Sequence, residues 1–198
     1  MKQISLDEIE QARERIAEST IRSPLIHLGV DNAPADVYLK LENLQPTGSF
    51  KVRGAGNATA LLTNGERARG VYTCSAGNMA QALAWHAHRN RIPCTAIVPD
   101  TAPETKLSAI KRFGANIIQL PWAEFWQVMM THRYAPLEGS AFIHAFSDRR
   151  MIAGNGTIGL EILEDLPNVD SVIIPFGGGG LTAGIATAIR GRKPNTRV

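Results

Sequence analysis

Hydrophobic positions along this 198-residue chain follow two alternating spacings. From Val71 onward, short apolar runs of strand length alternate with segments whose apolar residues recur every three or four positions. The predicted strand and helix pairs are 71–74 with 78–89, 94–98 with 103–113, 116–120 with 122–131, 141–146 with 151–163, and 171–176 with 181–190. This repeated alternation predicts an α/β fold with mostly parallel strands.

Two capping-box patterns mark predicted helix starts. Ser5 and Glu8 precede apolar residues at helical spacing, so an amphipathic helix is expected over 6–16. Thr101 and Glu104 form the second pattern, ahead of the helix expected over 103–113.

The segment before the alternation predicts one strand and one helix around a lysine. Residues 37–41 have the pattern of a strand, and 45–48 that of a turn. A helix is expected over 50–62, closed by Asn64-Gly65. Lys51 is therefore expected near a helix N-terminus.

Composition narrows the classes of function. The formal net charge is +3, and no dense basic stripe with interleaved aromatic residues indicates a nucleic-acid partner. Cys74 and Cys94 are the only cysteines, lack nearby His or carboxylate at metal-ligand spacing, and are predicted to be buried reduced thiols with no metal. No signal-peptide core or membrane-length apolar run occurs, so a cytoplasmic protein is expected.

Other conspicuous side chains are expected to have ordinary structural roles. The histidines lack a second ligand at useful spacing; they are His27, His86, His88, His132 and His144. An aromatic stripe at helical spacing is predicted to pack in the core; it comprises Trp122, Phe125, Trp126 and Met129. Glu161 and Glu164 are expected to face solvent.

Lys51 is the first candidate for chemistry. Phe50 and Val52 flank it with apolar bulk, and the positive end of a helix dipole disfavours an ammonium group. Both effects predict a lowered pKa. A neutral lysine amine can attack a carbonyl carbon to form a Schiff base, and once released it can remove a proton from a carbon atom.

Four consecutive glycines, Gly177, Gly178, Gly179 and Gly180, form the second candidate. They lie between a predicted strand and a predicted helix, where uncovered backbone N–H groups can bind phosphate. A flexible surface turn is one alternative. A dinucleotide site is another, because Gly178, Gly180 and Ala183 fit G-x-G-x-x-A, although no acidic residue follows Asp170.

The third candidate is the loop from Ser75 to Gln81, which joins a predicted strand to a predicted helix. Its free N–H groups and the Ser75 hydroxyl could bind a carboxylate. The same residue types also serve as ordinary helix caps.

Taken together, these segments resemble the fold type II enzymes that use pyridoxal phosphate, in particular the threonine/serine dehydratase and serine racemase group. The matching motifs are the run 49–55, the loop 75–78, Gly154-Asn155-Gly156-Thr157 with Glu161, and the loop 177–181. The resemblance implies two open, mostly parallel sheets flanked by helices, as in the tryptophan synthase β-like fold. Residues 58–149 would form a smaller mobile domain, and 1–57 with 150–198 a larger cofactor-binding domain that is incomplete at its C-terminus, with exposed apolar surface.

The resemblance also implies a role for each site residue. Lys51 would form the Schiff base with pyridoxal 5'-phosphate, and Phe50 would pack beside the cofactor ring. Asn78 would bind the 3'-oxygen of the ring. Residues from Gly177 to Leu181 would bind the phosphate. The substrate carboxylate would be bound by the group Ser75, Ala76, Gly77, Asn78 and Gln81.

The activity implied is β-elimination of L-threonine or L-serine to a 2-oxo acid and ammonia, with homodimers expected for full-length enzymes. Met79 stands where the family usually has histidine, which bears on ring contacts or substrate choice. Ala76 stands where serine racemases carry a second serine, and alanine cannot transfer a proton. Open alternatives are a racemase, a β-replacement or threonine synthase-like enzyme, and a catalytically inactive fragment or binding module.

Overall fold

The computed structural model describes residues 4–29 and 31–198, and it confirms the α/β alternation. The helices are α1 (Leu6–Ile16), α2 (Lys51–Ala60), α3 (Asn64–Arg69), α4 (Asn78–Asn90), α5 (Glu104–Lys111), α6 (Trp122–Thr131), α7 (Arg149–Asp165) and α8 (Gly180–Arg192). The strands are β1 (Leu25–His27), β2 (Tyr38–Lys40), β3 (Val71–Cys74), β4 (Cys94–Pro99), β5 (Asn116–Leu120) and β6 (Ala141–Phe142). Short 3-10 turns are η1 (Glu42–Leu44) and η2 (Ala135–Leu137).

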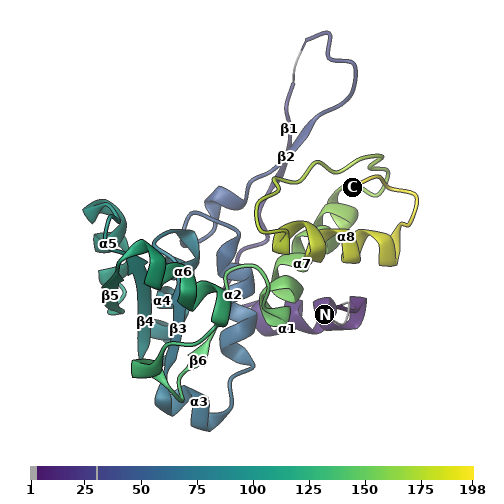
Figure 1. The fold of residues 1–198 in the computed structure, drawn as a ribbon. Coiled ribbons are helices and arrows are strands. Elements are labelled where there is room, and N and C mark those ends of the chain that lie inside the picture. Colours follow the sequence, from purple (N-terminus) through teal and green to yellow (C-terminus); the bar gives the residue numbers. More distant parts are fainter. Residues whose placement is uncertain (1–3, 30) are drawn as a thin grey trace.

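A four-stranded parallel sheet in the order β5-β4-β3-β6 forms one side of the molecule (Figure 1). Side chains alternate between its faces, as strand geometry requires. Val71 and Ala96 pack in the core that contains α4, whereas Tyr72, Cys74 and Ile97 pack in the core that contains α6. Both faces of the central strands are therefore buried, which explains why these strands have continuous apolar runs.

A helical layer of α1, α2, α7 and α8 lies beside the sheet (Figure 1). Glycines let these helices approach one another closely. A Cβ atom built on Gly154 of α7 would lie 2.7 Å from the Gly54 Cα atom of α2. One built on Gly156 would lie 2.9 Å from the Gly184 carbonyl oxygen of α8. Since real Cβ atoms do not approach other atoms this closely, glycine is required at these crossings.

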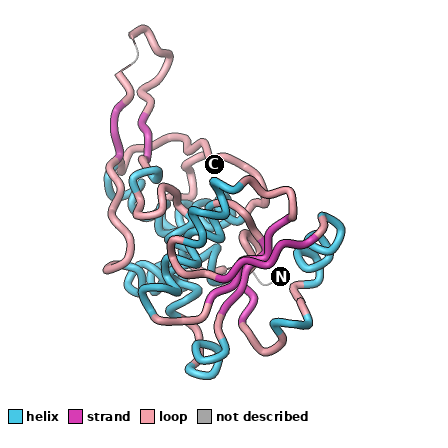
Figure 2. The backbone as a smooth tube through the Cα atoms, turned by 90° about the vertical axis from the view of Figure 1, so that its left-hand side faces the viewer, coloured by secondary structure: helices cyan, strands magenta, loops and turns pink. Residues whose placement is uncertain are grey.

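The β1–β2 hairpin projects away from both layers (Figure 2). Its strands are antiparallel, with Ile26 opposite Leu39. The strand predicted over 37–41 is thus confirmed in its central residues, whereas β1 was not predicted.

The strand predicted over 171–176 is wrong. Ser171 makes a single parallel bridge with Arg197, and the rest of the segment is loop. A parallel strand needs a neighbour along its length, and among the described residues only the chain end provides one. Ile173 is consequently 97% exposed and Phe176 78% exposed, which agrees with the expected exposed apolar surface. Among the described residues, the sheet β5-β4-β3-β6 is therefore the one predicted parallel sheet that forms.

Two predictions about helix ends are also wrong, while the Ser5–Glu8 capping box is confirmed. The helix predicted from Pro103 begins at Glu104 without a side-chain cap, so Thr101 forms no capping box. Asn64 and Gly65 do not close a helix; they begin α3, which is capped by its own box of Thr63 and Glu66. The Thr-x-x-Glu pattern at 63–66 could have indicated this start.

The aromatic stripe of α6 is only partly in the core. Phe125 is buried and Met129 packs beside the same cluster, as predicted. Trp122 and Trp126 were expected to be buried, but they are 60% and 50% exposed and stack on each other with ring centroids 5.9 Å apart. The helix buries one face only, and these indoles lie outside it.

Substitution of Gly184 by alanine tests the close packing of α7 and α8. The new methyl group would lie 2.7 Å from the Gly156 amide nitrogen, so the free energy of unfolding should fall by about 1–3 kcal/mol through overpacking. Gly29→Ala is the control, because nothing lies within 4 Å of that position. Urea denaturation measures both, and equal stability of the two variants would contradict the packing described here.

Candidate active site

Lys51 is the first residue of α2 and follows Phe50, which has helical backbone angles. Its amine donates a hydrogen bond of 2.5 Å to the Ala145 carbonyl oxygen and lies 5.1 Å from the centroid of the Phe50 ring. Burial lowers the pKa of Lys51 to about 8, in the direction predicted from the sequence. With this pKa about a tenth of the amine is neutral at pH 7, against less than about one part in a thousand for a lysine with an ordinary pKa.

The partner of Lys51 belongs to a turn formed by residues 144–147, which follows β6. The His144 Nδ1 atom accepts hydrogen bonds from the backbone N–H groups of Phe146, at 3.3 Å, and Ser147, at 3.0 Å. Sequence reasoning assigned His144 an ordinary role and did not identify this turn. A histidine followed by two residues that fold back on it has no distinctive sequence pattern.

The glycine loop contacts the same turn. A Cβ atom on Gly178 would overlap the Phe146 ring, and one on Gly180 would overlap the Phe146 carbonyl oxygen. Gly179 has a φ of 80° at the N-cap of α8, a left-handed conformation that favours glycine. The lysine and the glycine loop, 126 positions apart from Lys51 to Gly177, thus lie against neighbouring residues of one short turn.

A second apolar contact connects these two segments. Phe50 and Leu181 both pack against the cluster of Ile158, Ile162, Ile185 and Ile189. Leu181 directly follows the glycine loop, so the residues next to the lysine and next to the loop share one support. Gly177 and Gly178 remain exposed, while Gly179 is half-buried and Gly180 is buried.

The Ser75–Gln81 loop lies at the same edge of the sheet as the 144–147 turn. Each follows the carboxyl end of one of two paired parallel strands, β3 and β6, the edge at which open α/β sheets bind ligands. The Ser75 hydroxyl accepts a hydrogen bond from the Gly77 N–H group at 3.2 Å. Asn78 is exposed at the start of α4, Ala76, Gly77 and Gln81 are half-buried, and nothing lies within 4 Å of a Cβ atom on Gly77.

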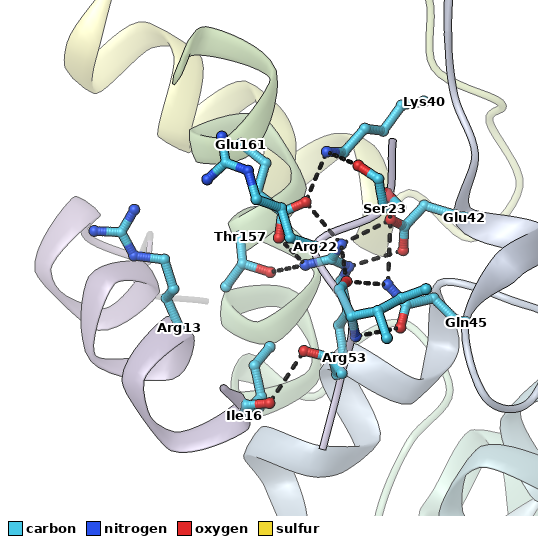
Figure 3. A network of polar contacts seen from close by, with 12 residues as sticks. Arg13, Ile16, Arg22, Ser23, Lys40, Glu42, Gln45, Arg53, Thr157 and Glu161 are labelled. Atoms are coloured by element: carbon cyan, nitrogen blue, oxygen red, sulfur yellow. Dashed lines mark hydrogen bonds and ion pairs between the residues drawn. The ribbon is translucent and has the colours of Figure 1, made fainter. Parts of the chain in front are cut away.

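A buried ionic network on the other side of α2 was missed by sequence reasoning (Figure 3). Arg53 is 1% exposed, and its guanidinium donates to both oxygens of Glu42 at 2.8 Å and to those of Glu161 at 2.6 and 2.9 Å. Lys40 adds an ion pair of 2.7 Å to Glu161. The expectation that Glu161 faces solvent is therefore wrong, because a buried guanidinium requires carboxylate partners. Glu164 does lie at the surface, paired with Arg13 and Arg22.

The other residues considered for chemistry have structural environments. Cys74 and Cys94 are buried and free, and burial raises the pKa of each thiol to about 12. His86 is buried with its Nε2 atom 2.8 Å from the Val52 carbonyl oxygen. Across residues 4–29 and 31–198, no group of three or more His, Cys, Asp or Glu side chains is arranged to hold a metal ion. In the same part of the chain, no helix combines the length and hydrophobicity needed to cross a membrane.

The fold and the site together define a class: an α/β protein in which a half-buried lysine and a glycine loop at a helix start converge at the carboxyl edge of a parallel sheet. The sequence model of the family described as "Pyridoxal-phosphate dependent enzyme" matches residues 16–198. The chain belongs to this family.

Individual relatives agree with this assignment. The L-threonine ammonia-lyase of Thermotoga maritima is 41% identical over 98% of this chain and 49% of its own length. The catabolic L-threonine dehydratase of Staphylococcus aureus is 42% identical over 98% of this chain and 57% of its own length. The chain thus spans about half the length of these curated relatives.

Solved structures show the same similarity. Maize serine racemase superposes with a TM-score of 0.92 at 33% identity, covering 99% of this chain and 60% of that one. Threonine deaminase isoform 2 from Solanum lycopersicum has a TM-score of 0.85 at 34% identity, covering 98% of this chain and 56% of that one.

The lowered pKa of Lys51 predicts unusual reactivity. An amine acylates only when neutral, so its labelling by a small anhydride should have a midpoint near pH 8, against about pH 10.4 for a lysine in a model peptide. Mass spectrometry of the Lys51 peptide between pH 6 and 11, without any cofactor, measures this midpoint. A value above pH 10 would show that the amine is solvated.

The buried network predicts a large stability difference between two glutamates on α7. Glu161→Gln removes a charge that faces Arg53, so unfolding should become easier by about 3 kcal/mol. Glu164→Gln weakens two exposed pairs, with Arg13 and Arg22, and should cost about 1 kcal/mol or less. Guanidinium denaturation compares the two, and a similar small loss for both would contradict a stabilising role of the network.

Proposed function

We propose that this chain provides the lysine and the phosphate and carboxylate loops of an ammonia-lyase that converts L-threonine or L-serine to a 2-oxo acid and ammonia by β-elimination. The observation that carries the proposal is the shared turn that contacts both Lys51 and the glycine loop. The names of the Thermotoga and Staphylococcus relatives support the substrate class. The activity belongs to the whole enzyme. The chain spans 49% of the Thermotoga relative and 57% of the Staphylococcus relative.

The residues around Lys51 fit pyridoxal 5'-phosphate. The buried hydroxyl groups of Ser49 and Thr182 have no hydrogen-bond partner in the described part of the chain. Ser49 lies two residues before the lysine, and Thr182 lies in the first turn of α8. Unpaired buried hydroxyls call for an absent partner, and a phosphate at the N-terminus of α8 would provide acceptors.

We assign the binding roles accordingly. Gly177 to Leu181, with Thr182, would hold the phosphate, and Phe50 would lie beside the ring. Asn78 would donate to the 3'-oxygen. Ser75 and Gln81, with the backbone at Ala76 and Gly77, would bind the substrate carboxylate, because the first amides of α4 are free to donate.

Pyridoxal phosphate, when bound, supplies an electron sink for the α-carbon of an amino acid. Lys51 is then suited to accept the α-proton, since a pKa of about 8 makes its amine an effective base near neutral pH. The Ala145 carbonyl oxygen accepts one N–H of this amine. This hydrogen bond fixes the orientation of the lone pair or protons that remain on the lysine nitrogen. Asn78, the first residue of α4, would orient the cofactor ring, and Ser75, in the loop before it, would orient the substrate carboxylate.

A racemase is the second candidate, because maize serine racemase superposes closely on this chain. Racemisation requires a second acid or base on the opposite face of the α-carbon. Ala76, in the Ser75–Gln81 loop, has no group that can transfer a proton. Elimination needs proton removal from one face only, so Ala76 favours the lyase over the racemase. A β-replacement enzyme, the other alternative, would need a second substrate.

The proposal includes the arrangement of the whole enzyme. Residues 58–149, which contain the parallel sheet, would move as a smaller domain against a larger one formed by 1–57 and 150–198. A cytoplasmic homodimer is proposed, by resemblance to full-length enzymes of this family. Its substrate would be a small-molecule amino acid, and it would have no nucleic-acid or membrane partner.

Cofactor attachment tests the proposal on the 198-residue chain. After incubation with pyridoxal phosphate and reduction with borohydride, mass spectrometry should find one phosphopyridoxyl group, on Lys51. Lys51→Arg, which keeps the charge, should abolish this label. Label at another lysine in the unsubstituted chain would reject the assignment of the site.

Product analysis tests the reaction. An active protein supplied with L-threonine or L-serine should release ammonia and the 2-oxo acid, and the Lys51→Arg protein should release neither above the uncatalysed level. Formation of D-serine without ammonia would identify a racemase instead.

A further inference from the structure

His144 lies at the centre of the contacts that bring the two halves of the site together. Its side chain is buried, with 6% of the residue exposed. Its Nδ1 atom accepts from the amides of Phe146 and Ser147, which closes the turn. An atom that accepts two N–H groups must be unprotonated, so the remaining ring proton of the neutral imidazole lies on Nε2.

The two residues enclosed by this turn each contact a different half of the site. The Ala145 carbonyl oxygen holds the Lys51 amine at 2.5 Å. The Phe146 ring lies against Gly178, and the Phe146 carbonyl oxygen lies against Gly180. The position of the lysine relative to the glycine loop therefore depends on the shape of residues 145–147.

The turn is anchored on both sides, which leaves the imidazole as the element that sets its shape. Before it, the Thr73 hydroxyl donates to the Ile143 carbonyl oxygen at 2.8 Å. After it, the Asp148 side chain accepts from the Arg150 N–H group at 2.8 Å and caps α7. Between these anchors, the described contacts that fold the backbone back on itself are those to His144 Nδ1.

We propose that His144 is a positioning residue of this site: its unprotonated Nδ1 atom folds residues 145–147 into the turn that holds the Lys51 amine on one side and the glycine loop on the other. This inference deepens the proposed function. Of its tests, only the measurement of cofactor binding rests on that function. His144 itself contacts the turn and its neighbours and acts through Ala145 and Phe146.

The surroundings of His144 favour the neutral ring. The titratable and charged groups around it are His132 at the end of α6, with ring centroids 4.8 Å apart, Asp148 at the start of α7 and Lys51 of α2. Burial first, and then His132 and Lys51, lower the pKa of His144 to about 4, against the opposing effect of Asp148. The acceptor is therefore available throughout the neutral range, and it is lost only as the pH falls through about 4.

Asparagine substitution separates positioning from simple packing. The side-chain oxygen of His144→Asn can accept the same two N–H groups but cannot titrate, whereas His144→Ala has no acceptor. His132→Asn is the matched control. It makes the same substitution at the adjacent ring, whereas the described amides of the turn donate to His144. Asparagine also tolerates the left-handed backbone of His132, where φ is 60°.

Two readouts on the 198-residue chain need no cofactor. Nitrogen NMR of the imidazoles should show His144 protonated on Nε2 at pH 7, and a proton on Nδ1 would overturn the inference. The acylation midpoint of Lys51 should rise by about one pH unit in His144→Ala, because a looser turn lets water reach the amine. It should stay within a few tenths of a unit in His144→Asn and His132→Asn.

Cofactor binding gives the third readout. The dissociation constant for pyridoxal phosphate should weaken about tenfold in His144→Ala, as expected for the loss of two backbone hydrogen bonds that shape the site. It should change less than about threefold in the two asparagine variants. If the unsubstituted chain binds no cofactor at Lys51, the proposed function fails, whereas the NMR and acylation results still decide the role of His144.

The outcome is decisive even if His144→Ala does not fold. In that case a folded His144→Asn protein with an unchanged Lys51 midpoint supports the inference. A folded His144→Asn protein with a midpoint shifted by one unit or more overturns it. A folded His144→Ala protein that matches the unsubstituted chain in both midpoint and cofactor affinity also overturns it.

Discussion

The buried guanidinium of Arg53 is the interaction on which the arrangement of the site depends. A charge that is 1% exposed cannot remain in the interior without partners, and Glu42 and Glu161 provide them with four short hydrogen bonds. The network also contains Lys40, which pairs with Glu161 and with Asp165. It joins η1, α2 and α7, elements far apart in the sequence, and fixes the first turn of α2, which carries Lys51.

The close approach of α2 to α7 is a second condition for the same geometry. Arg53 can reach Glu161 only because Gly54 and Gly154 let the two backbones lie almost in contact. Charge and steric complementarity therefore act at one helix crossing. The crossing also directs the opposite side of α2 toward the edge of the parallel sheet, where the 144–147 turn and the Ser75–Gln81 loop are located.

Sequence patterns predicted the elements whose stability is local. Periodicity identified the helices other than α3 and located the strands of the parallel sheet, and the three candidate segments were recognised from their residue types. The patterns failed where the outcome depends on distant partners. Residues 171–176 have the composition of a strand, but within the described part of the chain they have no neighbour to pair with along their length. Glu161 was expected to face solvent, but it faces a buried cation. The His144 turn has no motif, because its hydrogen bonds need only one side chain and two amides.

The placement of charge explains how Lys51 can have a lowered pKa although Arg53, two residues along the chain, is paired with two carboxylates. Residues two positions apart on an α-helix point about 200° apart, so Lys51 and Arg53 face opposite sides of α2. The anions of this region pair with Arg53 and Lys40, and among the described residues no carboxylate forms an ion pair with Lys51. Its partner is the neutral carbonyl of Ala145, which accepts a hydrogen bond without adding a full negative charge. Burial is then not offset by a counter-ion, and the amine loses its proton more readily. The ionic network that stabilises the fold thus also keeps negative charge away from the lysine.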